Sequence, residues 1–223
     1  VVFPYGGSME ERLTKLEQRI AALEQERAEA LYAHLEGSSE DLSGVKRVAM
    51  AAVQLGLSTA RLSAWMPRDY YDQSLATRQR LVGTSSTHHL CKSILLENMA
   101  FCASDEDPRL YPRYMVVIIQ YTRRLHALKF NTAVRQLKGL QRKKYDFRVA
   151  DERESEGLTG FMHNSMAPIG MATHMPTVLD ASIMELSPGY IWLGGGHVQV
   201  KLGCSTAELA ACIRDCIVAD VTA

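Results

Sequence analysis

Residues 114–122 read YMVVIIQYT, a run of β-branched and aromatic side chains that stays apolar through its middle. A continuous apolar run of this length, bounded by charge at Arg113 and Arg123, predicts a strand buried on both faces. A second strand is predicted just upstream at residues 91–98, CKSILLEN. These two strands anchor the expected sheet.

Short strands and short helices alternate in the rest of the chain. Strands are predicted at residues 145–150 and 176–179, and a glycine turn joins two more within residues 190–203. Helical spacing predicts a helix at residues 131–141, and residues 151–160 form a turn and a helix. This mixed order predicts one α+β (mixed α/β) domain.

The last helix is predicted over residues 205–220, STAELAACIRDCIVAD. Ser205 is the expected N-cap, and Glu208 three residues later completes a capping box. Cys212 and Cys216 would then lie one helical turn apart and pack as small apolar groups.

The N-terminal segment has a different pattern. Over residues 9–34, apolar residues recur at alternating steps of three and four, which is the a/d seam of a coiled coil. Polar residues continue the spacing at Arg27 and His34, so the seam weakens there. Two interpretations stay open: the helix pairs with another helix, in a dimer or another protein, or it packs on its own domain. The seam residues are Leu13, Leu16, Ile20, Leu23 and Ala30.

These patterns divide the chain into four parts. Residues 1–8 are expected to be an added leader, residues 9–36 a coiled-coil-type helix, and residues 37–84 a helical linker region. Residues 85–223 form the main domain. No internal repeat is visible.

Composition limits the classes of function. The 223 residues include 25 basic and 25 acidic side chains, which argues against a protein whose whole surface binds nucleic acid. Five cysteines without a CxxC pair indicate free thiols in a reducing cytosol. No run approaches the ~18 apolar residues of a membrane span, and no secretory signal is visible. A cytoplasmic protein without a membrane partner is expected.

The segment most suggestive of a binding site is residues 157–170, GLTGFMHNSMAPIG. It has too many Gly and Pro residues for a regular helix or strand, and it is too apolar for an ordinary solvated loop. Asn164, four residues before Pro168, stands where a positive φ is expected, which Asn tolerates. The segment forms either an ordinary turn or a set of backbone amides that bind an anion or an oxyanion.

Other polar residues each allow two roles. Lys92 in its strand either points to solvent or enters a cleft, where its ammonium would bind a ligand oxygen. Asp180 either caps a helix or presents a carboxylate to a ligand amine. The triplet Gly194–Gly196 lacks a nucleotide-loop pattern and is expected to be a tight turn. No metal site and no cofactor are expected, because the residues around His88 lack a second ligand group.

A basic sector follows the first strand pair. It is either a solvated face or an RNA-facing surface with aromatic neighbours for base stacking. The residues expected to contact tRNA are Arg123, Arg124, Lys138, Arg142, Lys143 and Lys144.

Taken in order, residues 91–98, 114–122, 143–171, 176–183 and 192–203 resemble the YbaK/prolyl-tRNA-synthetase-associated family of aminoacyl-tRNA editing domains. The resemblance covers roughly residue 85 to the C-terminus. It implies a barrel-like mixed β-sheet with surrounding helices, and hydrolysis of mischarged tRNA. The family's lysine matches Lys92, its aspartate Asp180, and its GxxxP loop residues 164–168. Asn164 replaces the first glycine of that loop.

The resemblance implies an editing site without a covalent nucleophile. Backbone amides from Asn164 to Gly170 would hold the aminoacyl carbonyl, and Lys92 would bind the phosphate or ribose of the terminal adenosine. The residues expected to form the substrate pocket are Phe161, Met162, Met166, Pro168, Ile169, Asp180, Gly194 and Gly195.

Two other functions remain open from the sequence. The domain could be a catalytically silent scaffold that binds tRNA or a synthetase and docks through residues 9–36; the coiled-coil pattern and Asn164 favour this alternative. A weaker third alternative is a hydrolase that acts on a small free aminoacyl ester.

Overall fold

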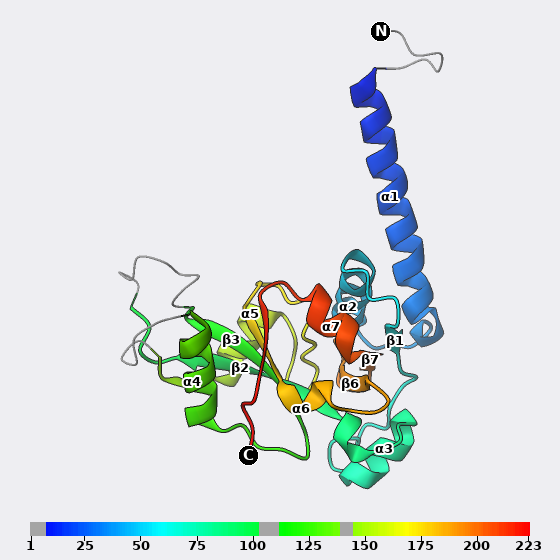
Figure 1. Ribbon diagram of the computed structural model, residues 1–223. Helices are drawn as coiled ribbons and strands as arrows, with labels where there is room; N and C mark the ends of the chain where they lie inside the picture. The colour runs from blue at the N-terminus through cyan, green and yellow to red at the C-terminus, as the bar shows by residue number, and fades with distance from the viewer. Residues whose placement is uncertain (1–7, 103–111, 139–144) are drawn as a thin grey trace.

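The computed structural model describes residues 8–102, 112–138 and 145–223. Two β-sheets and several short helices form the body, and one long helix projects from it (Figure 1). The larger sheet has the strand order β4-β2-β3-β5-β8. Its strands are β2 (Cys91–Asn98), β3 (Tyr114–Gln120), β4 (Phe147–Val149), β5 (Thr177–Asp180) and β8 (Cys216–Ala219).

The predicted central strand pair is confirmed. β3 is buried from Met115 to Gln120, as its continuous apolar run requires. β2 pairs with it antiparallel, with Lys92 opposite Ile119. On its other side β3 pairs in parallel with β5, which in turn pairs in parallel with β8.

The smaller sheet has the order β1-β7-β6 and contains the predicted glycine turn. Its strands are β1 (Arg61–Leu62), β6 (Tyr190–Gly194) and β7 (Lys201–Ser205). One isolated bridge, between Leu90 and Trp192, connects the two sheets within the described residues. The mixed α/β fold is confirmed, but the sheets are adjacent layers and do not close into the barrel-like sheet expected from the family resemblance.

Short helices surround the sheets. The helix predicted at residues 131–141 is confirmed through Lys138 and begins earlier, at Ala127, while residues 139–141 lie outside the described structure; the helix predicted within residues 151–160 is also confirmed. The helices of the body are α2 (Ser43–Gln54), α3 (Leu75–Val82), α4 (Ala127–Lys138), α5 (Glu152–Thr159), α6 (Ala181–Met184) and α7 (Thr206–Cys212), with 3-10 turns η1 (Ala33–Leu35) and η2 (Thr87–His89).

The predicted C-terminal helix is only half right. Ser205 caps α7 by accepting the backbone N–H of Glu208, as expected. The Glu208 carboxylate, however, accepts the backbone N–H of Thr59 at 3.0 Å instead of closing a capping box. The helix ends at Cys212, and β8 follows because residues from Cys216 onward pair with β5. Cys212 and Cys216 therefore lie on different elements.

Residues 37–84, expected to be a linker, contribute to the body. The apolar face of α2 carries Val45, Val48 and Ala52, all buried in the same core as Ile191 and Leu202 of the small sheet. β1 pairs antiparallel with β7. The segment is held by its own buried surface, which a linker would not have.

The long helix α1 (Met9–Tyr32) confirms the predicted N-terminal helix. Ser8, expected within an added leader, is its N-cap and forms a capping box with Glu11. Near its C-terminal end Ala28 and Tyr32 are buried against the body, while the N-terminal part projects away (Figure 1). None of the described helices combines the length and apolarity that crossing a bilayer requires.

Candidate active site

A cavity of about 640 Å³ opens beside β2. Its position follows from the shortness of β4, which pairs with β2 only from Leu96 to Asn98. β4 therefore does not extend along the edge of β2 as far as Lys92, and the loop after α5 covers that edge instead. The wall is completed by Tyr71 and Arg78 from the α3 region and by Gly194 at the end of β6.

Arg47 of α2 holds both ends of the loop at residues 160–170. Its guanidinium donates hydrogen bonds to the carbonyl oxygens of Gly160 and Gly170, and it lies 4.9 Å from the centroid of the Phe161 ring. Gly170 has a φ of 71°, and a Cβ there would come within 2.8 Å of the Arg47 carbonyl oxygen. Gly170 therefore closes the loop onto α2 and does not line the cavity.

The glycine turn after β6 supports the middle of the loop. Gly196 donates its N–H to the Ser165 carbonyl at 3.0 Å. A Cβ on Gly194 would lie 2.2 Å from the Met166 carbonyl oxygen, so only glycine allows the loop to pass this close. Gly194 lines the cavity, whereas Gly195 packs against the backbone of Val200.

Asn164 adopts a φ of 62°, which confirms the predicted positive φ. Its carbonyl oxygen accepts a hydrogen bond from the Tyr71 hydroxyl at 2.5 Å. Within the described residues, the backbone N–H groups of the cavity-lining residues Met162, Asn164 and Met166 have no acceptor. The loop thus keeps backbone donors available while the Asn164 carbonyl is held by a tyrosine.

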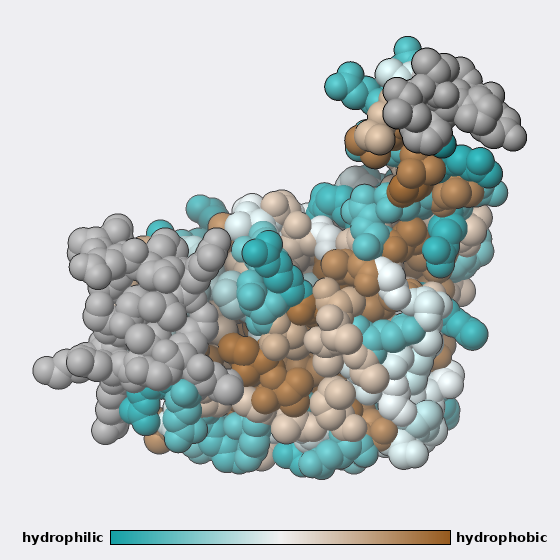
Figure 2. All heavy atoms as spheres, turned by 45° about the horizontal axis from the view of Figure 1, so that its top comes forward, coloured by the Kyte–Doolittle hydropathy of each residue, from teal (hydrophilic) through white to brown (hydrophobic). Residues whose placement is uncertain are grey.

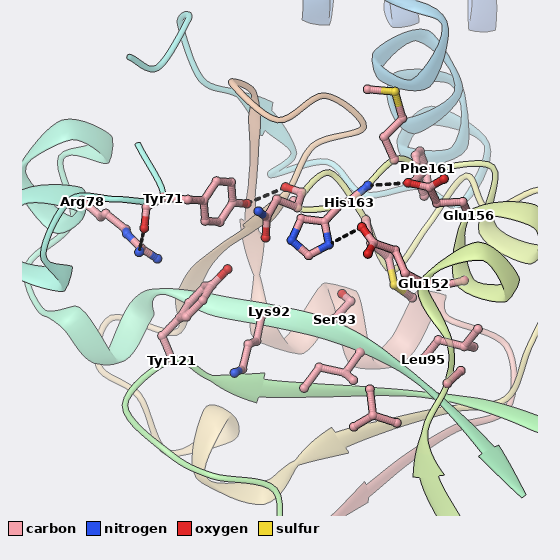
Figure 3. Close-up of a pocket in the computed structure, with 18 of the residues that line it drawn as sticks. Tyr71, Arg78, Lys92, Ser93, Leu95, Tyr121, Glu152, Glu156, Phe161 and His163 are labelled. Carbon is pink, nitrogen blue, oxygen red and sulfur yellow. Dashed lines mark hydrogen bonds and ion pairs between the residues drawn. The ribbon is translucent and has the colours of Figure 1, made fainter. Parts of the chain in front are cut away.

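The end of the cavity near β2 carries the cation of Lys92 and aromatic rings (Figure 3), and the α3 region adds Arg78 together with the carboxylate of Asp72. The Lys92 ammonium lies 5.4 Å from the centroid of the Tyr121 ring, and in the described part of the chain it makes no ion pair. Burial lowers the pKa of Lys92. The Arg78 guanidinium lies 5.3 Å from the Tyr71 ring centroid and donates to the Gln73 carbonyl at 3.0 Å.

The opposite side of the cavity is acidic (Figure 3). Glu152 and Glu156 stand one turn apart on α5 and both line the cavity. His163 links them to the loop: its Nδ1 lies 2.9 Å from Glu152 Oε1, and its backbone N–H donates to Glu156 Oε1 at 3.1 Å. The two carboxylates are therefore positioned on the cavity wall.

Ser93 also lies at the cavity. Its Oγ has no hydrogen-bond partner among the described residues, but the atom is fully buried and therefore lies behind the cavity surface.

Lys201 lies behind the cavity and supports Tyr71. Its Nζ donates to the Tyr71 hydroxyl oxygen at 2.8 Å and to the Val198 carbonyl at 2.7 Å. Burial, and secondarily the charge of Arg78, lowers the pKa of Lys201 to about 7. Hydrogen bonds therefore connect the small sheet to the loop without interruption, from Lys201 through the Tyr71 hydroxyl to the Asn164 carbonyl.

The predicted site residues divide into two groups. Those that line the cavity are Lys92, Phe161, Met162, Asn164, Met166 and Gly194. Pro168 and Ile169 are instead buried beneath the loop, with Ile169 packed in the core. Their apolar side chains anchor the loop and do not contact the cavity.

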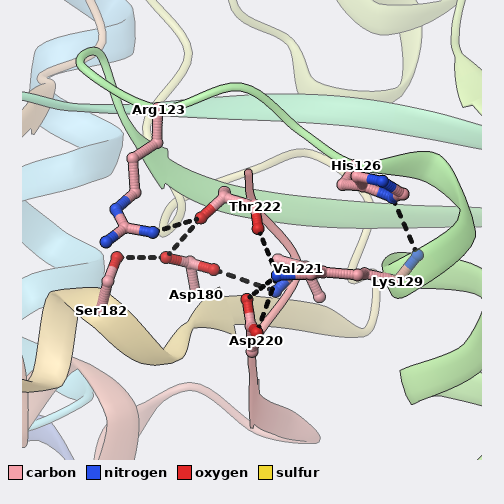
Figure 4. Close-up of polar contacts among 8 residues, drawn as sticks. All are labelled: Arg123, His126, Lys129, Asp180, Ser182, Asp220, Val221 and Thr222. Carbon is pink, nitrogen blue, oxygen red and sulfur yellow. Dashed lines mark hydrogen bonds and ion pairs between the residues drawn. The ribbon is translucent and has the colours of Figure 1, made fainter.

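Asp180 also lies outside the cavity, in a buried network at the C-terminal end (Figure 4). Its carboxylate accepts hydrogen bonds from the Val221 N–H at 3.0 Å, from the Thr222 hydroxyl at 3.2 Å, and from the Ser182 hydroxyl. Asp180 therefore holds the last residues of the chain, and the expectation that it faces a ligand is corrected.

The basic sector is described in part. Arg123 and Arg124 are exposed and follow Tyr121 of the cavity by two and three positions. Arg123 donates to the Thr222 hydroxyl at 3.3 Å. The side chain of Lys138 and the residues Arg142, Lys143 and Lys144 lie outside the described structure.

Several cavity residues were not predicted. Tyr71 and Arg78 belong to the segment expected to be a linker, and tertiary contacts bring that segment to the cavity, among them the pairing of β1 with β7 and the hydrogen bond between Lys201 and Tyr71. Lys201 was hidden inside a strand. Glu152 and Glu156 did carry a signal, because two carboxylates at positions i and i+4 lie on one face of a helix, here directly before the glycine-rich loop.

Comparison with known proteins finds solved structures that resemble this chain in fold. No protein-family model matches this sequence, and no curated protein matches it. A crystal structure described as "a putative trans-editing enzyme for prolyl tRNA synthetase" has a TM-score of 0.63 and 20% identity, covering 82% of this chain and 99% of that one. The crystal structure of hypothetical protein APE2540 has a TM-score of 0.59 and 22% sequence identity, and the match covers 79% of this chain and 99% of that one. The chain has the YbaK-like fold of these structures.

Proposed function

We propose that the protein is a trans-editing aminoacyl-tRNA deacylase, which hydrolyses the ester of a tRNA charged with a small, wrong amino acid. The observation that carries the proposal is the opposite charge of the two sides of the cavity: Lys92 and Arg78 on one, Glu152 and Glu156 on the other. An aminoacylated adenosine has the matching polarity, with phosphate at one end, an α-ammonium at the other, and the ester between them. The likeness in fold to the structure described as "a putative trans-editing enzyme for prolyl tRNA synthetase" supports the same class.

The chemistry requires little beyond positioning. Water adds to the carbonyl carbon, the carbonyl oxygen takes up negative charge, and collapse breaks the bond to the ribose oxygen, which leaves protonated as a free hydroxyl. Because an aminoacyl ester is already activated, a placed water and a stabilised oxyanion are sufficient. The N–H groups of Asn164 and Met166 are the donors we assign to the oxyanion, since neither has an acceptor among the described residues.

The substrate ends are assigned by charge. Lys92 binds the phosphate or ribose side of the terminal adenosine, and the ring of Tyr121 beside it offers a surface for base stacking. Glu152 and Glu156 receive the α-ammonium. The exposed Arg123 and Arg124 extend the basic surface toward the tRNA acceptor stem.

Selection by size follows from the loop. Phe161, Met162 and Met166 surround the position of the amino-acid side chain and exclude large acids by bulk. Substrates that differ by one methylene are separated by only about 1–3 kcal/mol in such a pocket. A panel of small amino acids is therefore expected to be accepted with graded rates.

A catalytically silent scaffold is the second candidate, and Asn164 is the observation in its favour. Its side chain lies on the cavity wall where the family has glycine. The backbone conformation does not distinguish the two functions, because Asn at a φ of 62° leaves the N–H groups of the loop in place.

Deacylation assays separate the two candidates. Alanyl-, seryl- and cysteinyl-tRNA-Pro are incubated with the wild type, with Lys92→Met, and with Lys15→Met as a control that removes an exposed lysine of α1. We expect accelerated hydrolysis of at least one substrate by the wild type and the control, and a loss of about 10- to 100-fold in Lys92→Met. Salt-sensitive tRNA binding without turnover by the wild type would instead establish the scaffold.

A further inference from the structure

The projecting part of α1 exposes a row of large apolar side chains. Met9, Leu13, Leu16, Ile20 and Leu23 are 49–81% exposed. Hydrophobic atoms are visible along the projecting helix in Figure 2. This row is the predicted seam as far as Leu23, extended at its start by Met9, and below the word seam means this exposed part. Within the described residues nothing covers it, although a contiguous apolar stripe on a protein surface marks an interaction site.

The seam has the geometry of a two-stranded coiled coil. Leu13 and Ile20 occupy a positions, while Met9, Leu16 and Leu23 occupy d positions. An isolated helix with this pattern gains its stability from a partner that covers the stripe. The partner must therefore present a complementary helical seam.

The charges beside the seam identify that partner as a second copy of the chain. The g positions carry Arg12 and Arg19, and the e positions of the following heptads carry Glu17 and Glu24. In a parallel pair each g residue faces the e residue of the next heptad on the other helix. Arg12 then meets the partner's Glu17, and Arg19 meets the partner's Glu24, and symmetry repeats both pairs.

The antiparallel arrangement is opposed by the same charges. It places e positions opposite e positions, so that Glu10, Glu17 and Glu24 would face the same residues of the other helix. Like charges in that position repel. We propose that the protein forms a parallel homodimer through a coiled coil of residues 9–26, with both bodies at the same end of the coil.

The limit of the coil is set by the body. Ala28 and Tyr32 are buried in the core of their own chain, so from there the helix has already found its packing partner. Arg27 occupies the next a position with a charge. Two and a half heptads or so remain for the dimer, so the association is weak and depends on concentration.

Charge exchange tests the proposal in the full-length chain. One variant carries Arg12→Glu and Arg19→Glu, and the other carries Glu17→Arg and Glu24→Arg. Sedimentation equilibrium is expected to show a concentration-dependent dimer for the wild type, at least tenfold weaker association for each variant alone, and a heterodimer when the two are mixed. A wild type that is monomeric at every concentration, or variants that dimerise alone as well as it does, would overturn the proposal.

Cross-linking tests the orientation. In a parallel pair residue 9 lies opposite its own copy, so Met9→Cys is expected to form a disulfide-linked dimer on mild oxidation. Gln18→Cys places the thiol at the outer f position and is expected to remain uncross-linked, like the wild type, which controls for the native cysteines. Equal cross-linking of both variants, or of neither, would contradict a parallel coil.

Discussion

The cavity beside β2 and the projecting half of α1 differ in the kind of chemical group that each leaves without a binding partner. The cavity holds the Lys92 ammonium, which contacts the Tyr121 ring but makes no ion pair among the described residues. The helix holds apolar groups without cover, on an element that is otherwise well capped. The chemistry of the missing partner follows from this difference: a small charged ligand for the first, an apolar helix for the second.

The largest expected effect concerns the residue behind the cavity. Because the pKa of Lys201 falls from 10.5 to about 7, the unfolded chain binds its proton more tightly than the folded one. Stability should therefore rise with pH by about 4 kcal/mol between pH 7 and 10.5, of which about 2 kcal/mol falls between pH 7 and 9. The rise is measured as the difference in unfolding free energy between the wild type and Lys201→Met in urea, because the contributions of the other titrating groups cancel in that difference.

Lys46→Met provides the control for Lys201. It removes an exposed lysine of α2. The difference in unfolding free energy between this variant and the wild type should stay constant over the same pH range. A constant difference for Lys201→Met as well would show that Lys201 keeps an ordinary pKa.

Gly194→Ala is expected to displace the loop. The added Cβ would lie 2.2 Å from the Met166 carbonyl oxygen, which forces the loop off the end of β6. A displacement of about 1 Å at a reacting centre costs on the order of 100-fold in rate. Deacylation is compared with Gly157→Ala, where a Cβ meets nothing within 4 Å. Wild-type activity in Gly194→Ala would mean that the loop does not form the site.

The acidic side of the cavity is tested through the substrate ammonium. Glu156→Gln should reduce deacylation about tenfold, because a charge-assisted hydrogen bond contributes roughly 1.5–3 kcal/mol. N-acetylated substrate lacks the ammonium, so after correction for its slower spontaneous hydrolysis the variant and the wild type should act on it equally. A tenfold loss on both substrates would instead indicate that Glu156 acts through the loop, by way of the His163 N–H.

Tyr71→Phe removes the hydrogen bond that the hydroxyl donates to the Asn164 carbonyl and the one that it accepts from Lys201, and it leaves the ring in place. A neutral hydrogen bond contributes about 1 kcal/mol, so we expect a decrease of about fivefold in kcat/KM with the same substrate preference. Tyr190→Phe is the matched control, since its hydroxyl bonds to the Thr59 carbonyl in the small sheet. Equal effects of the two changes would assign Tyr71 a purely structural role.

The smallest expected effect is the change in deacylation rate when the seam is disrupted. Ile20→Asp places a charge in the apolar row and should abolish the dimer while changing deacylation by each chain less than about twofold, because the seam lies on the projecting helix. Sedimentation and single-turnover assays on the same samples make the comparison. A parallel loss of activity would show that the site needs both copies.

Local patterns predicted the elements of the fold better than their assembly. The apolar run of β3 and the three-and-four spacing of α1 determine their own structures, so both were predictable from residue type alone. The end of α7 was not, because residues 216–219 become a strand only through pairing with β5. The role of α2 was likewise hidden, since its apolar face is explained only by the small sheet it covers.

The candidate site shows the same limit. Lys92 and Asn164 were found because one interrupts an apolar strand and the other stands in a segment that forbids regular structure. Tyr71 and Lys201 are 130 residues apart and meet only after the small sheet has formed. Asp180 is of a residue type that can bind a ligand amine, but its carboxylate is engaged by tertiary hydrogen bonds from the C-terminal residues.

The most direct test of the editing function is the single-turnover decay of alanyl-, seryl- and cysteinyl-tRNA-Pro with the wild-type protein in excess. We expect that at least one of these esters is hydrolysed well above its spontaneous rate, and that Lys92→Met returns that rate toward the spontaneous value while Lys15→Met does not. Spontaneous rates for every ester with the wild type, or an undiminished rate in Lys92→Met, would contradict this expectation.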